Sequence, residues 1–200
     1  MNIKINRPLA IVKVHTTGQN PSIDRIVEVT ITRHSPDGKV KSGTRTINPE
    51  CHIPQEATDI HGITNEAVEN KKTLDQVGKN LLAFLEGADI AGFNVKFDIE
   101  MLASEFSRMG LDFSVVNRSV YDLYEIYINQ NPRTFAAAIA QYVDPSFQDK
   151  KIVGTEEYVS LCNNLLEKMV APISNGSDDI DEALNKNGVN TKMLDVRGWF

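Results

Sequence analysis

The chain has 200 residues, of which 41% are hydrophobic, and this suits one globular domain with an appended tail. Its formal net charge of −6 gives no electrostatic footprint for nonspecific nucleic-acid binding, which usually takes the form of a basic stripe. No segment approaches the roughly 20 apolar residues of a membrane span, and the first residues lack the apolar run of a signal peptide. We therefore expect a soluble cytoplasmic protein with no membrane partner.

The apolar pattern predicts strands first and then strands that alternate with helices. Strands are expected at residues 9–14, 25–33, 40–47, 89–93 and 115–122, and helices after the capping residues Thr64 and Thr73 and at residues 98–109, 123–129, 134–143 and 156–170. The turn signal Ser35-Pro36-Asp37-Gly38 joins the second and third strands, so the first three form an antiparallel meander. This order is typical of an α/β fold with a mixed sheet.

The composition changes after Pro172 to Ser174-Asn175-Gly176-Ser177-Asp178-Asp179, which is typical of a linker. The chain is therefore expected to consist of a domain at residues 1–170 and a linker with a C-terminal extension at residues 171–200. The two cysteines, Cys51 and Cys162, match no metal or redox spacing, and we expect both to be free and buried.

Three stretches within residues 7–170 carry a family resemblance. They are the strand that runs into His15-Thr16-Thr17-Gly18, the pattern Ile53-Pro54-x-x-Ala57-Thr58-x-Ile60-His61-Gly62-Ile63-Thr64, and Gly92-Phe93-Asn94-Val95-Lys96-Phe97-Asp98. Together they resemble the DEDD (DEDDh-type) 3′-5′ exonucleases, the family of the proofreading epsilon subunit of bacterial DNA polymerase III. The resemblance implies a ribonuclease-H-like exonuclease fold, in which a central mixed sheet of about five strands, the first three antiparallel, is flanked by helices.

The resemblance also implies two-metal hydrolysis of phosphodiesters, with carboxylates that hold two magnesium or manganese ions. In the family the first strand ends Asp-x-Glu-Thr-Thr-Gly, and this chain has Lys13 and His15 at the two acidic positions. Asp98 remains from the second motif. An ammonium repels a divalent ion, and neutral imidazole is a poor magnesium ligand. We therefore expect no bound metal and no cofactor, and we take Asp98 as the one clear remnant of the catalytic set.

The family's third motif, His-x-x-x-x-Asp at the start of the last helix, should lie within residues 146–158, a window that has no histidine. One alignment places Lys150 and Thr155 on the histidine and the aspartate. In a shifted register Asp149, Glu156 or Glu157 reaches the cleft instead. The tyrosine variant of the motif, Tyr-x-x-x-Asp, is also missing from this window.

The remaining candidate site residues follow from the resemblance. Nucleotide contacts are expected from Thr16, Thr17, Gly18, Ile60, His61 and Asn94. The Thr-Thr-Gly turn either presents backbone N–H groups to a nucleotide or is kept for folding, and both readings stay open. A zinc pair of His15 and His61 is weaker than the reading in which His15 fills a vacated ligand position. His34 and His52 are expected in surface loops.

Three functions fit these observations. The first is an inactive exonuclease-like protein whose cleft binds single-stranded DNA or RNA, or a nucleotide, without cutting it. The second is a protein–protein module, such as an accessory subunit of a DNA- or RNA-processing assembly. The third is an active 3′-5′ exonuclease with a shifted ligand set. We also expect the Lys13 ammonium to lie within about 4 Å of the Asp98 carboxylate, or to be bridged to it by one water, because the resemblance implies that both positions face the same metal in the family.

Overall fold

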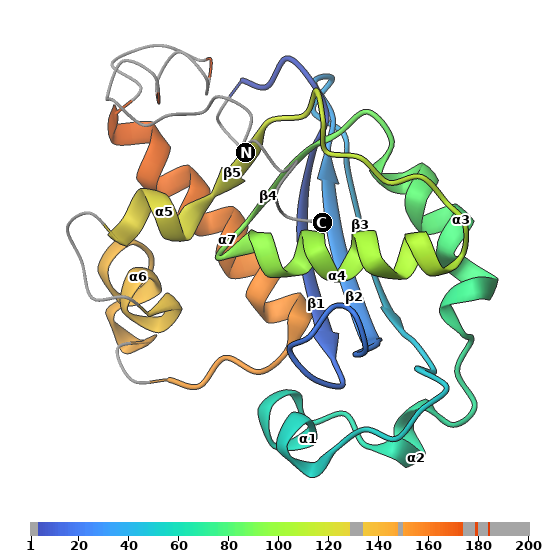
Figure 1. The fold of residues 1–200 in the computed structure, drawn as a ribbon. Helices are drawn as coiled ribbons and strands as arrows, with labels where there is room; N and C mark the ends of the chain where they lie inside the picture. The colour runs from blue at the N-terminus through green and yellow to red at the C-terminus, as the bar shows by residue number, and fades with distance from the viewer. Residues whose placement is uncertain (1–3, 129–133, 148–149, 174–178, 180–183, 185–200) are drawn as a thin grey trace.

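The computed structural model describes residues 4–128, 134–147, 150–173, 179 and 184. Within these residues the strands form one mixed sheet in the order β3-β2-β1-β4-β5 (Figure 1). The strands are β1 (Leu9–Thr16), β2 (Ile26–His34), β3 (Val40–Thr46), β4 (Asp89–Gly92) and β5 (Val120–Asp122). β1, β2 and β3 pair antiparallel, whereas β4 runs parallel to β1, and β5 parallel to β4. The α/β fold class and the antiparallel meander expected from the sequence are confirmed.

The helices are α1 (Gln55–His61), α2 (Asn65–Val68), α3 (Leu74–Leu85), α4 (Val95–Arg108), α5 (Leu123–Ile128), α6 (Phe135–Tyr142) and α7 (Thr155–Val170), with short 3-10 turns at Pro145–Phe147 and Ala171–Ile173. The expected caps are present. Thr64 accepts a hydrogen bond from the N–H of Ala67, and Thr73 forms a reciprocal capping box with Gln76.

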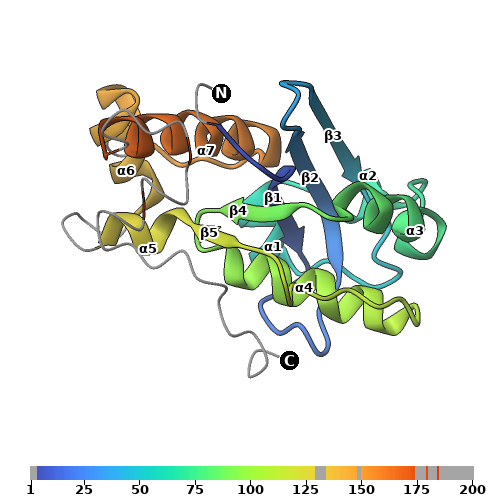
Figure 2. The same cartoon turned by 90° about the horizontal axis from the view of Figure 1, so that it is seen from above.

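The sheet lies between two layers of helices, with α3 and α4 on one face and α5, α6 and α7 on the other (Figure 2). Alternate residues of β1 supply both cores, because successive side chains of a strand point to opposite faces. Leu9 and Ile11 pack with the α7 layer, and Val12 and Val14 pack with the α4 layer. All four are buried. The apolar run of β1 therefore reflects burial on both faces.

The last strand is shorter than expected, since β5 begins at Val120 and the sequence predicts a strand from residue 115. The N–H of Arg118 donates to the carbonyl of Val115, and Asn117 has a left-handed φ of 67°. These residues therefore form a turn. β4 has four residues, and it pairs with β5 through Val120, Tyr121 and Asp122 alone.

The C-terminal extension falls mostly outside the described residues, including the expected linker at 174–178 and the Trp199-Phe200 end. Leu184 is buried against the same apolar cluster as Leu9, and Asp179 forms a β-bridge with Lys4. The division of the chain at residue 170 stays a prediction. None of the helices in the described part of the chain is long and apolar enough to span a bilayer.

Candidate functional site

Lys13 of β1 and Asp98 of α4 meet beside the sheet. The Lys13 Nζ atom lies 3.2 Å from Asp98 Oδ1, and the backbone N–H of Val14 donates to the same oxygen at 2.8 Å. The expected convergence of the two side chains is confirmed. Lys13 thus directs a positive charge at the Asp98 carboxylate.

Asp98 is almost completely buried, with 1% of its side chain exposed. Burial raises the pKa of its carboxyl, and the ammonium of Lys13 and the N–H of Val14 oppose that rise. Its second oxygen, Oδ2, has no hydrogen-bond partner among the described residues. The ammonium of Lys13 and the N–H of Val14 therefore offset the free-energy cost of removing the Asp98 carboxylate from water.

A second carboxylate positions Asp98 by fixing the start of α4. The Asp122 carboxylate, at the end of β5, accepts hydrogen bonds from the N–H groups of Asn94 at 2.7 Å, Val95 at 3.0 Å and Tyr124 at 2.9 Å. Asn94 takes a left-handed φ of 56°. α4 consequently begins at Val95, three residues earlier than expected, and Asp98 lies in its first turn. Burial raises the pKa of Asp122, while the three N–H donors oppose the shift.

The Lys13 ammonium faces a cleft of about 520 Å³, which is lined by Lys13, Gln19, Phe93, Asn94, Phe97, Tyr124 and Tyr158. Four of these seven residues are aromatic. The ring centres of Phe93 and Tyr124 lie 5.4 Å apart. The ring of Phe135 stacks on that of Tyr158, with 4.2 Å between the ring centres. Phe97, Tyr124 and Tyr158 are half-buried, so each ring keeps part of its surface open to solvent.

Tyr158 is a site residue that the sequence analysis missed. It is the fourth residue of α7, its hydroxyl donates to the carbonyl of Phe93 at 2.7 Å, and Lys13 Nζ lies 5.0 Å from the centre of its ring. A cation over an aromatic face is attractive. The start of α7 is the feature that could have indicated Tyr158. With the helix beginning at Thr155, its fourth residue faces β1.

His15 lies two residues after Lys13 in β1, on the same side of the strand. Its Nε2 atom donates to the carbonyl of Val153 at 2.8 Å, and its ring centre lies 5.1 Å from that of His61. Burial, followed by the charges of His61 and Lys13, lowers the pKa of His15 to about 4. His15 is therefore neutral at pH 7.

His61 is held by two backbone groups in a single tautomer. Its Nδ1 atom accepts from the N–H of Ile63 at 3.0 Å, so its Nε2 atom carries the proton that is donated to Thr16 O at 3.2 Å. Burial lowers the pKa of His61 too. Both ring nitrogens are thereby engaged, and a zinc pair with His15 would require these bonds to break.

The Thr16-Thr17-Gly18 turn is held by hydrogen bonds within the connection from β1 to β2. Thr17 donates its N–H to the carbonyl of Arg25 at 2.9 Å and its hydroxyl to Asp24 at 3.0 Å, and the Thr16 hydroxyl donates to Gly18 O. A Cβ atom on Gly18 would lie 2.5 Å from the Asp24 carboxylate, so a larger residue here would displace that side chain from its contact with Thr17. These contacts favour the reading in which the turn is kept for folding.

The other residues that were expected to contact a nucleotide lie in different parts of the structure. Asn94 lines the cleft beside Lys13, whereas Ile60 lies on α1 with 56% of its surface exposed. Lys151 Nζ donates to the carbonyl of Asp59 at 2.6 Å, which ties the segment before α7 to α1. Of the six residues expected to contact a nucleotide, Asn94 is the one that lines this cleft.

Among the described residues, the candidates for a third motif do not line the cleft. The Thr155 hydroxyl donates to Glu28 and accepts from Thr30 at 2.7 Å, and Lys150 lies over the ring of Phe147. Glu156 lines a different groove, between β3 and α7, and Glu157 is exposed. Asp149 lies outside the described residues.

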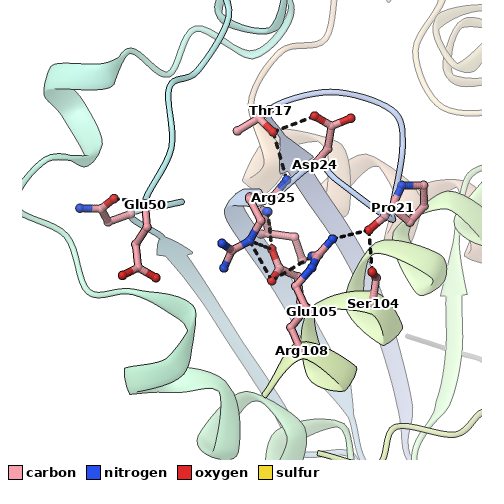
Figure 3. A network of polar contacts seen from close by, with 10 residues as sticks. Thr17, Pro21, Asp24, Arg25, Glu50, Ser104, Glu105 and Arg108 are labelled. Atoms are coloured by element: carbon pink, nitrogen blue, oxygen red, sulfur yellow. Dashed lines mark hydrogen bonds and ion pairs between the residues drawn. The ribbon is translucent and has the colours of Figure 1, made fainter. Parts of the chain in front are cut away.

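A buried carboxylate on α4 fixes the loop that carries Gln19 (Figure 3). Glu105 Oε1 accepts from Arg25 Nε at 3.0 Å and from the N–H of Ile26 at 2.9 Å, and Oε2 lies 3.3 Å from Arg108 Nη1. Arg108 and Ser104 both donate to the carbonyl of Pro21. The middle of the loop and its β2 end are therefore anchored to the helix that carries Asp98.

Two further expectations are wrong. His34, expected in a surface loop, ends β2 and is buried, with its Nε2 atom hydrogen-bonded to Asn163 of α7. Cys51, expected to be buried, is exposed, whereas Cys162 is buried and its thiol pKa is raised by that burial. Packing of α7 over the end of β2 buries His34, whereas the turn after β3 leaves Cys51 in solvent.

The residues present do not fit a divalent ion at the Lys13–Asp98 position. The ammonium of Lys13 already contacts the Asp98 carboxylate. Among the described residues, no three His, Cys, Asp or Glu side chains are grouped closely enough to hold a metal ion. A hard cation such as magnesium needs several oxygen ligands at one point.

Residues 15–150 match the model of a protein family described as RNase_T exonuclease. This chain belongs to the exonuclease family. It is 33% identical over 110 residues to a DNA polymerase III PolC-type of Thermotoga petrophila, a match that covers 54% of this chain and 8% of that one. It is 28% identical over 92 residues to the DNA polymerase III subunit epsilon of Treponema pallidum, covering 46% and 43%.

Solved exonuclease structures share the fold of this family member. Escherichia coli exonuclease I in complex with a dT13 oligonucleotide superimposes with a TM-score of 0.64 at 15% identity, over 82% of this chain and 42% of that one. A zinc-bound exonuclease I–single-stranded DNA complex has a TM-score of 0.68 at 15% identity, over 90% and 43%. The chain spans less than half the length of each of these proteins. The ribonuclease-H-like exonuclease fold is confirmed.

Proposed function

We propose that this exonuclease-family protein does not hydrolyse phosphodiesters and keeps its cleft as a binding site for single-stranded nucleic acid. The observation that carries the proposal is the contact between Lys13 and Asp98, in which a protein ammonium lies 3.2 Å from the carboxylate that would ligate a metal. Two-metal catalysis requires divalent ions that activate water and stabilise the leaving oxygen. A lysine stabilises the carboxylate but supplies neither function.

The geometry also supports an alignment for the third motif. Tyr158 lies against Lys13, and the residue five positions before it, Val153, has its carbonyl bonded to His15. The spacing His-x-x-x-x-Asp thus fits Val153 and Tyr158 better than Lys150 and Thr155. In this alignment both the general base and the last carboxylate are replaced by side chains that cannot take their roles.

Binding without cutting is supported by the lining of the cleft. Partly exposed rings of Phe97, Tyr124 and Tyr158 surround one cation, Lys13. Aromatic rings beside a positive charge are the usual means of holding unstacked bases and their phosphates. The exonuclease I structures with the same fold contain bound single-stranded DNA.

The rival functions make different predictions. An accessory protein module would bind neither nucleotide nor oligonucleotide in this cleft, and the net charge of −6 is compatible with it. An active exonuclease would shorten a labelled single strand from its 3′ end in a metal-dependent manner.

A nuclease assay with magnesium or manganese tests the proposal, and oligonucleotide binding is measured in the same samples. We expect no release of nucleotides above background, together with binding that Tyr124→Ala weakens. Metal-dependent shortening that Asp98→Ala abolishes would overturn the proposal, because it would assign Asp98 to a working catalytic set.

A further inference from the structure

The charges of the cleft lining are sparse. Of the seven residues that line it within the described part of the chain, Lys13 is the one cation, and none is acidic. Nonspecific binders of long single strands use a positively charged groove that follows many phosphates. One cation in the lining matches one phosphate.

The Lys13 ammonium has hydrogen-bonding capacity beyond its contact with Asp98. An ammonium has three N–H donors, and the contact with Asp98 Oδ1 uses one of them. The side chain keeps 18% of its surface exposed, on the side of the cleft. A phosphate oxygen can therefore approach the same nitrogen without displacing Asp98.

The aromatic residues of the lining, which we call the aromatic wall, offer a surface for the base of a nucleotide. They are Phe93, Phe97, Tyr124 and Tyr158. Phe97 lies in α4 and Tyr124 in α5, and both half-buried residues line the cleft beside Asn94. Base stacking on such a ring contributes about 1–3 kcal/mol per base and depends little on sequence. The Asn94 amide, exposed in the same lining, has a donor and an acceptor for a base edge.

We infer that the cleft binds a single nucleotide unit without any metal ion, with the phosphate on the Lys13 ammonium and the base on the aromatic wall. This inference rests on the proposed function and specifies its ligand. The volume of about 520 Å³ falls within the range of roughly 300–1,000 Å³ that is usual for small-molecule sites. Lys13 takes the position of the ion as the cationic contact for phosphate, so divalent ions are not required.

The first experiment measures binding of thymidine 5′-monophosphate by calorimetry in the presence of EDTA. We expect binding that magnesium does not strengthen, and at least tenfold weaker binding of thymidine and of inorganic phosphate, because each has half of the contacts. Binding of the nucleotide that appears on addition of magnesium and disappears with EDTA would overturn the inference. Absence of nucleotide binding under both conditions would overturn it too, and would leave the proposed lack of hydrolysis to the nuclease assay.

Two strand probes distinguish the sources of the nucleotide unit. A linear oligothymidylate has free ends, whereas its circular form has none. Preference for the linear strand over the circle identifies a strand end as the ligand, and preference for the mononucleotide over both identifies a free nucleotide. Equal binding of circle and linear strand, tighter than that of the mononucleotide, would contradict a single-nucleotide site.

Lys13→Gln and Lys96→Gln form the matched pair of variants. Lys96 precedes Asp98 on α4 by two residues, pairs with Glu100 at 3.7 Å and does not line the cleft. We expect Lys13→Gln to weaken mononucleotide binding at least tenfold and Lys96→Gln to leave it within a factor of two. Equal affinities of Lys13→Gln and the unmodified protein would exclude Lys13 as the phosphate contact.

The salt dependence of the unmodified protein provides a test that requires no substitution. One phosphate contact predicts a slope of about −0.7 for the logarithm of affinity of a linear strand against the logarithm of salt concentration. A slope steeper than about −2 would indicate several phosphate contacts and would overturn the single-nucleotide inference.

Discussion

The ammonium of Lys13 and the carboxylate of Asp98 form an ion pair across 3.2 Å, between residues that come from a central strand and from the first turn of a helix 85 positions further along the chain. The pair is partly enclosed, since 18% of the lysine side chain and 1% of the aspartate side chain are exposed. It couples the stability of the fold to the chemistry of the cleft.

Removal of the lysine charge should destabilise the protein in a pH-dependent manner. Lys13→Met leaves a buried carboxylate without its cation, and we expect the free energy of unfolding to fall by roughly 3 kcal/mol near pH 8. The pKa of Asp98 is raised by burial, so the folded state retains a proton that the unfolded state releases. Stability is therefore lost as the pH rises through the folded-state pKa, and the effect of Lys13→Met should be smaller near pH 5.

Urea denaturation at the two pH values measures this effect, and Lys96→Met is the control. Lys96 makes an exposed ion pair with Glu100, and its loss should change the free energy of unfolding by less than about 1 kcal/mol. The same loss for both variants, or a loss for Lys13→Met that does not depend on pH, would show that the ion pair is not what stabilises Asp98.

Restoration of the four substituted positions tests the alignment of the third motif. In the proposed alignment, the variant with Lys13→Asp, His15→Glu, Val153→His and Tyr158→Asp carries the family's motif residues around Asp98. We expect it to gain manganese-dependent 3′-5′ shortening of a labelled single strand, at a cost in stability from the added buried carboxylates.

The matched control restores the first motif in the same way but uses the other alignment, with Lys150→His and Thr155→Asp. We expect no activity from it, because Thr155 contacts Glu28 and Thr30 away from the cleft. Activity in the control and none in the first variant would reverse the alignment. Circular dichroism of both variants establishes that each is folded.

His15 should make the protein sensitive to acid. Its pKa is lowered from 6.5 to about 4 by burial and by the neighbouring charges of His61 and Lys13. The unfolded state binds a proton near pH 6.5 and the folded state only near 4, so the contribution is complete above pH 6.5 and is lost as the pH falls through about 4. A difference of this size corresponds to at most about 3 kcal/mol.

The free energy of unfolding between pH 7 and pH 4 checks this prediction in His15→Gln, which retains a donor for the carbonyl of Val153. We expect a shallower decline with acid than in the unmodified protein. His52→Gln, at an exposed histidine, should follow the unmodified protein. Parallel curves for His15→Gln and the unmodified protein would contradict a depressed pKa for His15.

Glu105 should contribute stability through the loop that it anchors. Glu105→Gln removes a buried charge that is shared by Arg25, Arg108 and the N–H of Ile26, and we expect the free energy of unfolding to fall by about 2–4 kcal/mol. Thermal denaturation measures it, with Asp37→Asn as the control in an exposed pair with Lys39. A change no larger than that of the control would mean that Arg25 and Arg108 find other partners.

Local patterns were sufficient to predict much of the fold. The apolar run of β1 and the turn at Ser35–Gly38 led to the antiparallel meander, because both depend on neighbouring residues. Thr73 led to the start of α3, because a capping box spans only four residues. The motifs around Lys13 and Asp98 led to their convergence, through the resemblance to the exonucleases and not through spacing alone.

The tertiary structure decided which helix faces pack on the sheet and which residues far apart in the sequence come into contact. His34 is buried because α7 brings Asn163 to it across 129 positions, and no local pattern carries that information. The same helix turns Tyr158 toward Lys13, where a shift of one residue would present Glu157 instead. The sequence by itself determined which elements form, since this follows from residue identity and short-range periodicity, and its resemblance to the exonucleases predicts that Lys13 and His15 stand at metal-ligand positions. The structure decided which side chains share the cleft, since that depends on the rotation of each helix against the sheet.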